Sequence, residues 1–188
     1  IRALTRRFEA PVSVDTWKSS VAEAAVQAGA SMINDIWGLK GDPKMARVAA
    51  ESGAACCLMH NRKEAVYEDF MREVAADLMA SVETAREAGV RDDRIILDPG
   101  VGFAKSYAQN LEVIARLEEL ACLGFPVLLG TSRKSVIGKT LDLPADQRLE
   151  GTLVTTVYAV QKGCAFVRVH DVKENLRAIQ MTKALMRG

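Results

Sequence analysis

Short apolar runs alternate with helical patterns along the chain, and this alternation constrains the fold more than any other feature. Each run is short, rich in β-branched residues or leucine, and free of strict apolar–polar alternation. Such runs are typical of strands buried on both faces of a parallel sheet. The six runs cover residues 12–14, 32–36, 54–59, 95–97, 127–129 and 166–169.

Apolar stripes with helical spacing fill the intervals between the runs. Apolar residues that recur every four positions predict one long amphipathic helix before the fourth strand. A second apolar stripe predicts another helix after that strand. The first stripe consists of Val66, Phe70, Val74, Leu78 and Val82, and the second of Leu111, Ile114, Leu117 and Ala121.

Helix boundaries are also marked in the sequence. Asp42 followed by Pro43 predicts a helix start, and Asp171 predicts the start of a last helix whose Leu176 and Ile179 face inward. A glycine lies a few residues before each strand from the second to the sixth, where a left-handed residue commonly ends a helix. These glycines are Gly29, Gly53, Gly89, Gly124 and Gly163.

Strict alternation of strands and helices leaves two architectures, an open doubly wound sheet and a closed barrel. Polar residues follow every predicted strand, and in a barrel these strand ends meet at one catalytic mouth. No GxGxxG or GxxxxGK[ST] motif occurs, which disfavours nucleotide-binding sheets and P-loops. We predict an α/β TIM (β/α)8 barrel. Since eight units take ~250 residues, the 188 residues hold about six and lack the first two strands.

Composition excludes several classes of protein. The formal net charge of +1 lacks the basic excess of a non-specific nucleic-acid binder. No apolar run approaches the ~20 residues of a membrane-spanning helix, and residues 1–8 are too charged for a signal peptide. The four cysteines show no zinc-binding spacing and lie in or beside apolar stretches. We therefore expect buried free thiols, a cytoplasmic location, and neither a nucleic-acid nor a membrane partner.

Three acceptor side chains follow or end buried strands and form the first half of a predicted pocket. Asp15, Asn34 and Asp98 each occupy such a position, and a buried carboxylate is costly unless it meets donors. Asp15 also fits a helix cap, whereas Asp98 precedes a turn. Two or three acceptors in one pocket suit a flat heterocycle with amino and ring N–H donors. A metal site is the competing use, although a neutral asparagine makes it less specific.

Cationic side chains form the second half of the pocket. Arg168 and His170 are two residues apart on the last strand and so point to the same side. Arg133 and Lys134 lie among small residues after the fifth strand, near the loops where barrels often bind phosphate. His60 is interpreted as a hydrogen-bonded histidine at the barrel rim. The pocket therefore predicts a ring-containing substrate that carries phosphate or pyrophosphate.

Six segments in this order resemble the dihydropteroate synthase family of pterin-binding barrels. The pair of SRKS and RVHD is the most specific part of the resemblance, which extends from about Pro11 to the C-terminus. The segments are PVSVDT (11–16), INDI (33–36), LMH (58–60), LDPGVGFAK (97–105), GTSRKS (130–135) and RVHD (168–171).

The resemblance implies a transferase of folate biosynthesis. Such an enzyme condenses 6-hydroxymethyl-7,8-dihydropterin pyrophosphate with para-aminobenzoate, and gives 7,8-dihydropteroate and pyrophosphate. It further implies Mg²⁺ as cofactor, sulfonamides as competitors of para-aminobenzoate, and a homodimer. The family's metal-binding asparagine and its Thr-Arg-Pro loop would precede Ile1, so no metal ligand is expected in this chain.

The resemblance also assigns roles to individual residues. Lys134, Asp98, Arg168 and His170 are the expected catalytic residues. Arg168 and His170 would bind pyrophosphate, while Ser132, Phe103 and Lys134 would bind para-aminobenzoate. The expected pterin-binding residues are Asp15, Asn34, Met59, Asp98, Phe103, Gly130 and Lys134.

Two alternatives to this function remain open at this point. A pterin-barrel methyltransferase acting on methyltetrahydrofolate would share the acceptor side chains but would not need the cationic cluster. A catalytically incomplete pterin-binding fragment would keep the pterin pocket alone.

Overall fold

The computed structural model describes residues 1–188, and the chain divides into two compact units. The first unit comprises residues 1–62 and 72–98, and the second comprises residues 63–71 and 99–188. Both contain parallel strands and helices.

The first unit contains four helices, a short 3₁₀ turn and a four-stranded sheet. Its helices are α1 (Arg2–Arg7), α2 (Ser19–Gln27), α3 (Met45–Ser52) and α4 (Phe70–Glu87), and the turn η1 spans Asp92–Arg94. Its strands are β1 (Ser13–Asp15), β2 (Met32–Asp35), β3 (Ala55–Met59) and β4 (Ile95–Asp98).

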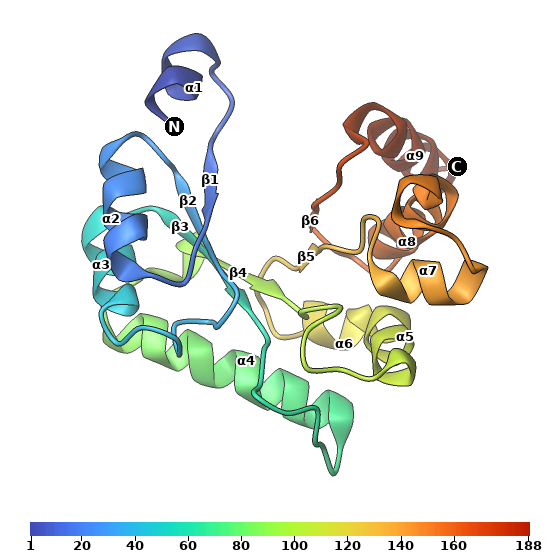
Figure 1. Cartoon of the computed structure of the whole chain (residues 1–188), viewed down its shortest axis with the longest axis horizontal. Helices are drawn as coiled ribbons and strands as arrows, with labels where there is room; N and C mark the ends of the chain where they lie inside the picture. The colour runs from blue at the N-terminus through green and yellow to red at the C-terminus, as the bar shows by residue number, and fades with distance from the viewer. The chain divides into compact units, whose positions relative to one another are not determined.

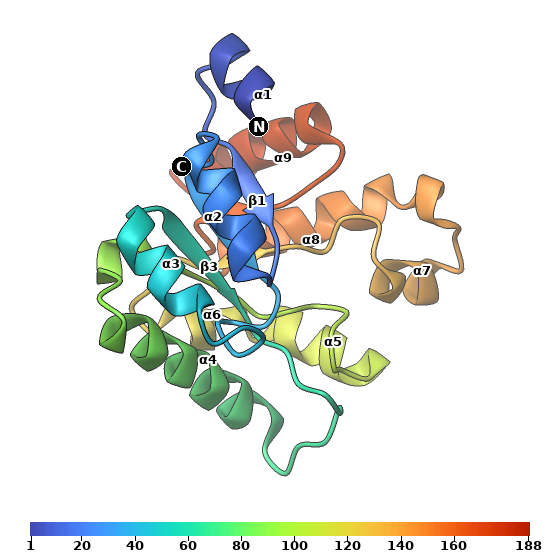
Figure 2. The same ribbon diagram turned by 60° about the vertical axis from the view of Figure 1, so that its left-hand side comes forward.

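The sheet order in the first unit is β1-β2-β3-β4, with every neighbouring pair parallel. Each strand therefore lies beside its successor in the chain, as in a barrel, and the order does not reverse as it does in a doubly wound sheet. Helices α2, α3 and α4 cover one face of this sheet (Figure 1), and Figure 2 shows them following one another across it.

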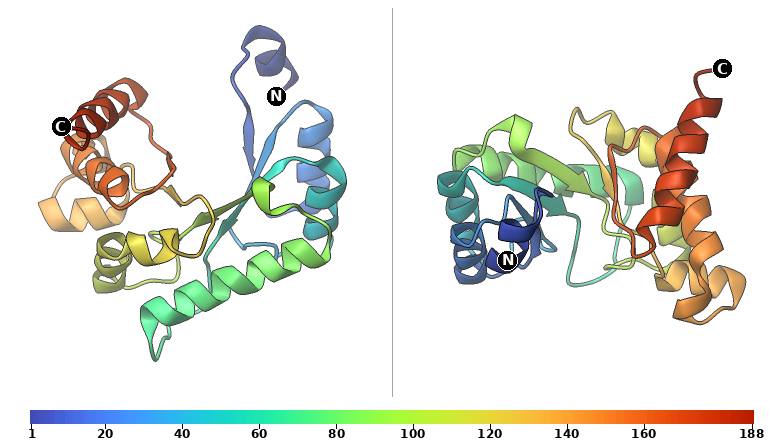
Figure 3. Two further views of the ribbon diagram at one scale, coloured as in Figure 1. Left: turned by 180° about the vertical axis from the view of Figure 1, so that it is seen from behind. Right: turned by 90° about the horizontal axis from the view of Figure 1, so that it is seen from above.

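The second unit is richer in helix. Its helices are α5 (Tyr107–Ala115), α6 (Leu117–Ala121), α7 (Ser135–Leu141), α8 (Leu149–Gln161) and α9 (Val172–Leu185), with the 3₁₀ turn η2 (Ala145–Gln147). Its strands β5 (Leu128–Leu129) and β6 (Phe166–Val167) pair in parallel. Helices α8 and α9 pack together, as Figure 3 shows from two directions.

The predicted strands and helix-ending glycines are confirmed. A strand overlaps each of the six runs, and the five glycines have φ values between 65° and 104°. One placement is wrong: β6 ends at Val167, so Arg168 and His170 follow the last strand instead of lying on it, and they line the same cavity from the loop. Burial on both faces holds for β2, β3 and β4 but not for β1 or β6. Position in the sheet does not explain the difference, because β4 is also a terminal strand and β5 also belongs to the sheet of two, yet both are buried.

The two predicted helical stripes need correction. Helix α4 begins at Phe70, so Val66 precedes it and is 68% exposed. The second stripe is divided between α5 and α6, because Arg116 leaves helical geometry at φ −112° and ψ 27°. The remaining α4 stripe at Val74, Leu78 and Val82 is fully buried, and each such side chain contributes roughly 1.5–3 kcal/mol on burial.

Two predicted helix starts also differ in detail. Helix α3 begins at Met45, and the Asp42 carboxylate accepts the amide of Lys44 at 2.9 Å before the helix and that of Ser19 at 2.8 Å. Asp171 occupies the N-cap of α9 without a side-chain cap bond, because its carboxylate binds Arg133. Leu176 does not face inward but is 51% exposed.

The cysteine prediction holds in part. Cys56 and Cys57 are buried free thiols, and burial raises the pKa of Cys56 to about 12. Cys122 is a free thiol but is exposed, because it lies just beyond the end of α6. No helix is long and apolar enough to cross a lipid bilayer.

Candidate active site

Polar side chains at the carboxyl ends of the first unit's strands lie beside one another. Asp15 and Asn34 are partners in the register of β1 and β2, and the Asn34 amide donates to the Asp15 carboxylate at 3.1 Å. Met59 and Asp98 are partners in the register of β3 and β4, and both are buried. Asp15 makes no helix cap, since α2 is preceded by Lys18. The structure thus brings these four predicted pterin residues to one edge of the sheet.

Asp35 follows Asn34 as the last residue of β2, and its side chain binds the backbone of the loop after the strand. Its carboxylate accepts the amides of Trp37 at 2.9 Å and Leu39 at 2.8 Å, and Leu39 has a left-handed φ of 69°. Burial raises the pKa of Asp35, against the opposing effect of the two amides. Two backbone amides thus provide the hydrogen bonds that a buried carboxylate needs. Asp35 therefore has a structural role beside Asn34.

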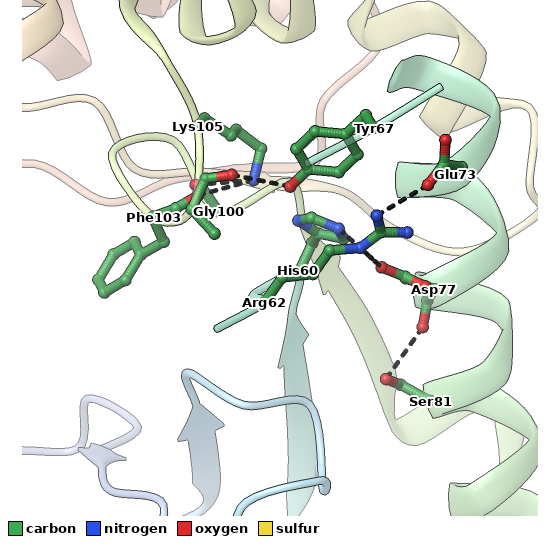
Figure 4. A network of polar contacts seen from close by, with 10 residues as sticks. His60, Arg62, Tyr67, Glu73, Asp77, Ser81, Gly100, Phe103 and Lys105 are labelled. Carbon is green, nitrogen blue, oxygen red and sulfur yellow. Dashed lines mark hydrogen bonds and ion pairs between the residues drawn. The ribbon is translucent and has the colours of Figure 1, made fainter. Parts of the chain in front are cut away.

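His60, directly after β3, is hydrogen-bonded as predicted. Its Nε2 lies 3.1 Å from the Asp77 carboxylate on α4, and its side chain is fully buried. Arg62 donates to the same carboxylate at 2.6 Å and to Glu73 at 2.7 Å, so Arg62 lies between the two acidic residues (Figure 4). Burial favours the neutral carboxyl, but the hydrogen bond from Arg62 and nearby positive charges outweigh it and lower the pKa of Asp77.

The predicted cationic cluster lines one cavity of the second unit. This cavity of about 270 Å³ lies at the ends of β5 and β6. Its walls carry two cations and a histidine, while a glycine leaves room for the guanidinium: a Cβ at Gly130 would lie 3.0 Å from the Arg168 Nη2. The lining residues are Gly130, Ser132, Lys134, Arg168, Val169 and His170.

Hydrogen bonds connect the two loops beside this cavity. Ser132 Oγ lies 2.9 Å from His170 Nδ1 and accepts the His170 backbone amide at 3.2 Å. Arg133 is not part of the lining, because its guanidinium forms a double hydrogen bond with Asp171 at 3.2 and 2.7 Å. That hydrogen bond lowers the pKa of Asp171. Arg133 thus holds the loops together and leaves the cavity to Lys134 and Arg168.

Lys134 joins this cavity to the loop after β4. Its Nζ donates to the Val101 carbonyl and lies 5.1 Å from the centre of the Phe103 ring. An ammonium over a ring face is attracted by the ring's quadrupole. Phe103 and Lys134, which the family resemblance assigns to both substrates, are therefore in contact.

Sequence reasoning missed the residues that hold this loop. Asn110 accepts the Gly102 amide at 2.6 Å and donates to the carbonyls of Lys105 and Ser106 at 3.2 and 2.7 Å. A detectable signal existed, because Ser106 and Gln109 form a capping box that fixes the start of α5. With that start known, Asn110 falls in the first helical turn beside the loop.

Comparisons with known proteins agree with these observations. Residues 1–170 match the family of pterin binding enzymes. The dihydropteroate synthase of Clostridium beijerinckii is 53% identical over the whole chain, which spans 70% of that protein. The Bacillus subtilis dihydropteroate synthase is 55% identical over 99% of the chain, which spans 65% of it.

A solved structure shows the same fold. The Clostridium difficile dihydropteroate synthase, crystallised in the presence of pteroic acid, matches all of this chain with a TM-score of 0.97 and 48% identity. The chain covers 72% of that structure. The fold class is accordingly an α/β TIM barrel, of which this chain carries six βα units. By sequence and by structure, the chain belongs to the pterin binding enzymes and, among them, to the dihydropteroate synthase family.

Proposed function

We propose that this chain carries the pterin and pyrophosphate sites of a dihydropteroate synthase, which joins 6-hydroxymethyl-7,8-dihydropterin pyrophosphate to para-aminobenzoate. The observation that carries the proposal is the cavity that Lys134, Arg168 and His170 line together. A guanidinium, an ammonium and an imidazole within one cavity suit a pyrophosphate leaving group.

The reaction exchanges one bond for another at the pterin methylene. The C–O bond to pyrophosphate breaks, and its electron pair stays on the leaving oxygen. The amine nitrogen of para-aminobenzoate donates its lone pair to the methylene carbon, forms the C–N bond and loses a proton to solvent. Because the arylamine is itself the nucleophile, no nucleophilic side chain is required.

Charge placement explains how the residues would assist this exchange. Arg168 and His170 would stabilise the negative charge that develops on pyrophosphate as the C–O bond breaks. Asp98 and Asp15 would favour a pterin ring that becomes electron-poor, and Asn34 would add a neutral amide. The hydrogen bond between Asn34 and Asp15 supports a shared role for this pair.

The arylamine subsite is proposed at Ser132, Phe103 and Lys134. The contact of Lys134 with the Phe103 ring supports this placement, because one aromatic face and one ammonium suit a ring that bears a carboxylate. Met59 and Gly130 complete the proposed pterin lining. Sulfonamides, which resemble para-aminobenzoate, are expected to compete at this subsite.

Mg²⁺ stays a prediction from the family resemblance. Residues 1–188 contain no group of three or more His, Cys, Asp or Glu side chains placed to hold a metal ion. Mg²⁺ usually binds through one or two protein side chains together with substrate phosphates, and the steps above use this chain's own side chains alone.

We propose further that residues 1–188 act as a single pterin-binding domain and that the protein is a cytoplasmic homodimer. A cavity of about 320 Å³ between α5, α7 and α8 supports the dimer, since its surface is almost entirely apolar. Leu111, Leu141 and Val154 line it and are exposed. A second copy of this chain is the partner proposed for that face.

The test is release of pyrophosphate from the two substrates in the presence of Mg²⁺. We expect release that depends on para-aminobenzoate and falls by more than ~10-fold in Arg168→Ala, because a charged hydrogen bond contributes roughly 1.5–3 kcal/mol. The control is Arg177→Ala, which removes an exposed arginine of α9.

Other outcomes would contradict the proposal. Pterin binding without pyrophosphate release would indicate the incomplete fragment, since the chain spans 65 to 72% of the length of these relatives. Pyrophosphate release that survives Arg168→Ala unchanged would contradict the pyrophosphate-binding role of Arg168. Methyl transfer from methyltetrahydrofolate without pyrophosphate release would indicate the methyltransferase alternative, which nothing in the comparisons favours.

A further inference from the structure

The segment after β3 carries one tyrosine that differs from its neighbours. Residues 63–66 and 68–69 are exposed, whereas Tyr67 is half-buried. The Tyr67 hydroxyl donates to the Ala104 carbonyl at 2.8 Å, and its ring meets Phe70 edge-on at 4.9 Å. The Tyr67 hydroxyl therefore connects this segment to the loop after β4, as Figure 4 shows for Tyr67 and the loop.

The backbone that Tyr67 contacts is strained. Ala104 has a φ of +42°, in the left-handed region that residues with a Cβ rarely adopt. Such a conformation persists when its surroundings fix it. The next residue contributes to this restraint, because Lys105 Nζ donates to the carbonyls of Gly100 and Phe103 at 3.1 Å each.

The strained residue lies next to the substrate-facing part of the loop. Phe103 directly precedes Ala104, and its ring is covered by the Lys134 ammonium at 5.1 Å. Lys134 also binds the Val101 carbonyl. A movement of the Ala104 backbone would therefore pass directly to Phe103, the residue whose ring contacts Lys134.

We propose that Tyr67 is a positioning residue for the arylamine subsite: its hydroxyl holds the Ala104 carbonyl and so fixes Phe103 beneath Lys134. The inference rests on the proposed function, in which Phe103 and Lys134 receive para-aminobenzoate. Without the hydroxyl, the loop is ordered only when the substrate binds, and the free energy of ordering is taken from the binding free energy. We therefore expect weaker binding of para-aminobenzoate but an unchanged reaction in the bound complex.

The variant Tyr67→Phe tests the proposal in the full chain, since it removes the hydroxyl and keeps the ring against Phe70. We expect the KM for para-aminobenzoate to rise about five-fold, in line with the loss of one hydrogen bond, with kcat within about two-fold. Amide hydrogen exchange across residues 100–105 should become faster in the same variant.

The matched control is Tyr107→Phe. Its hydroxyl lies 3.0 Å from Thr140 Oγ1 on α7, in the same unit, and so binds another element than the loop after β4. This variant should change neither KM nor exchange at residues 100–105. A role confined to packing would give Tyr67→Phe the KM and exchange rates of the unmodified chain, and that result would overturn the proposal.

The two readouts separate this proposal from the proposed function. If the unmodified chain releases no pyrophosphate, the proposed function fails, and the exchange measurement still decides whether the hydroxyl restrains the loop. Faster exchange in Tyr67→Phe with an unchanged KM would mean that the loop is restrained but does not position the arylamine, which contradicts the inference.

Discussion

Lys134 differs from a solvated loop lysine in its contacts. It binds the Val101 carbonyl, covers the Phe103 ring and lines the cavity with Arg168. A lone lysine in a loop is usually a solvated charge, but the strand end and the small residues around Lys134 in GTSRKS favour a ligand-binding role. At the residue scale, the structure therefore distinguishes Lys134 from its neighbour Arg133, which is engaged by Asp171.

Replacement of Lys134 by alanine should reduce turnover by more than ~10-fold, because charged hydrogen bonds contribute roughly 1.5–3 kcal/mol. The measurement is the rate of pyrophosphate release with both substrates saturating. The control is Lys183→Ala, at an exposed lysine in the last turn of α9. Turnover equal to that of the control would show that Lys134 has no part in the reaction.

At the scale of elements, helix α4 is tied to the segment after β3 by a charged cluster. Asp77 accepts from both His60 and Arg62, and Glu73 accepts from Arg62 one turn earlier. These groups are partly buried, so solvent screens them less than exposed pairs.

The variant Asp77→Asn should lower the free energy of unfolding at neutral pH by roughly 1–2 kcal/mol, since it removes a charge-assisted acceptor. The deficit should depend on pH. The folded state lowers the pKa of Asp77 below its ordinary 3.8, so its contribution is present above that value and is lost as pH falls through the lowered pKa.

Urea unfolding at pH 7 and at successively lower pH values measures this dependence. The difference between the unmodified chain and Asp77→Asn should shrink as pH falls below about 4. The exposed pair of Arg91 and Asp93 supplies the control, because Asp93→Asn should change stability by less than about 0.5 kcal/mol. A deficit that stays constant with pH would contradict the assignment to the Asp77 charge.

At the scale of the whole molecule, the apolar cavity between α5, α7 and α8 predicts self-association. We expect light scattering to give a mass of twice the 20.4 kDa chain, and Val154→Asp to give the mass of one chain. Val154 is 67% exposed and lines the cavity. The aspartate variant would place a carboxylate inside the apolar face, and burial of that charge without a partner is costly.

The matched control for this prediction is Val172→Asp. Val172 is 64% exposed, lies in the same unit at the start of α9, and does not line the cavity. Its variant should keep the mass of the unmodified chain. If both variants remain dimeric, a different face carries the association, and a monomeric unmodified chain would contradict the proposed homodimer.

The secondary structure follows closely from the sequence, because strands and helix ends depend on local signals. Six apolar runs gave six strands, and five glycines gave five left-handed positions. The errors occur where neighbours in space decide the outcome. Val66 has the right spacing for α4 but lies outside it, and Asp171 prefers Arg133 to the amides of its own helix.

The candidate site also has features that local sequence signals predict and features that depend on neighbours in space. The sequence by itself determined the residue types at each strand end, since parallel strands place their carboxyl ends at one edge, and it determined the family through motifs such as SRKS and RVHD. The tertiary structure alone decided which of those groups line the cavity. In the structure Arg133 binds Asp171 outside the cavity, and Lys134 lies over the Phe103 ring. Tyr67 binds the Ala104 carbonyl, which is 37 residues away in the sequence. Hydrogen bonds and charge pairs depend on distances in space, and a strand-end position does not encode these distances.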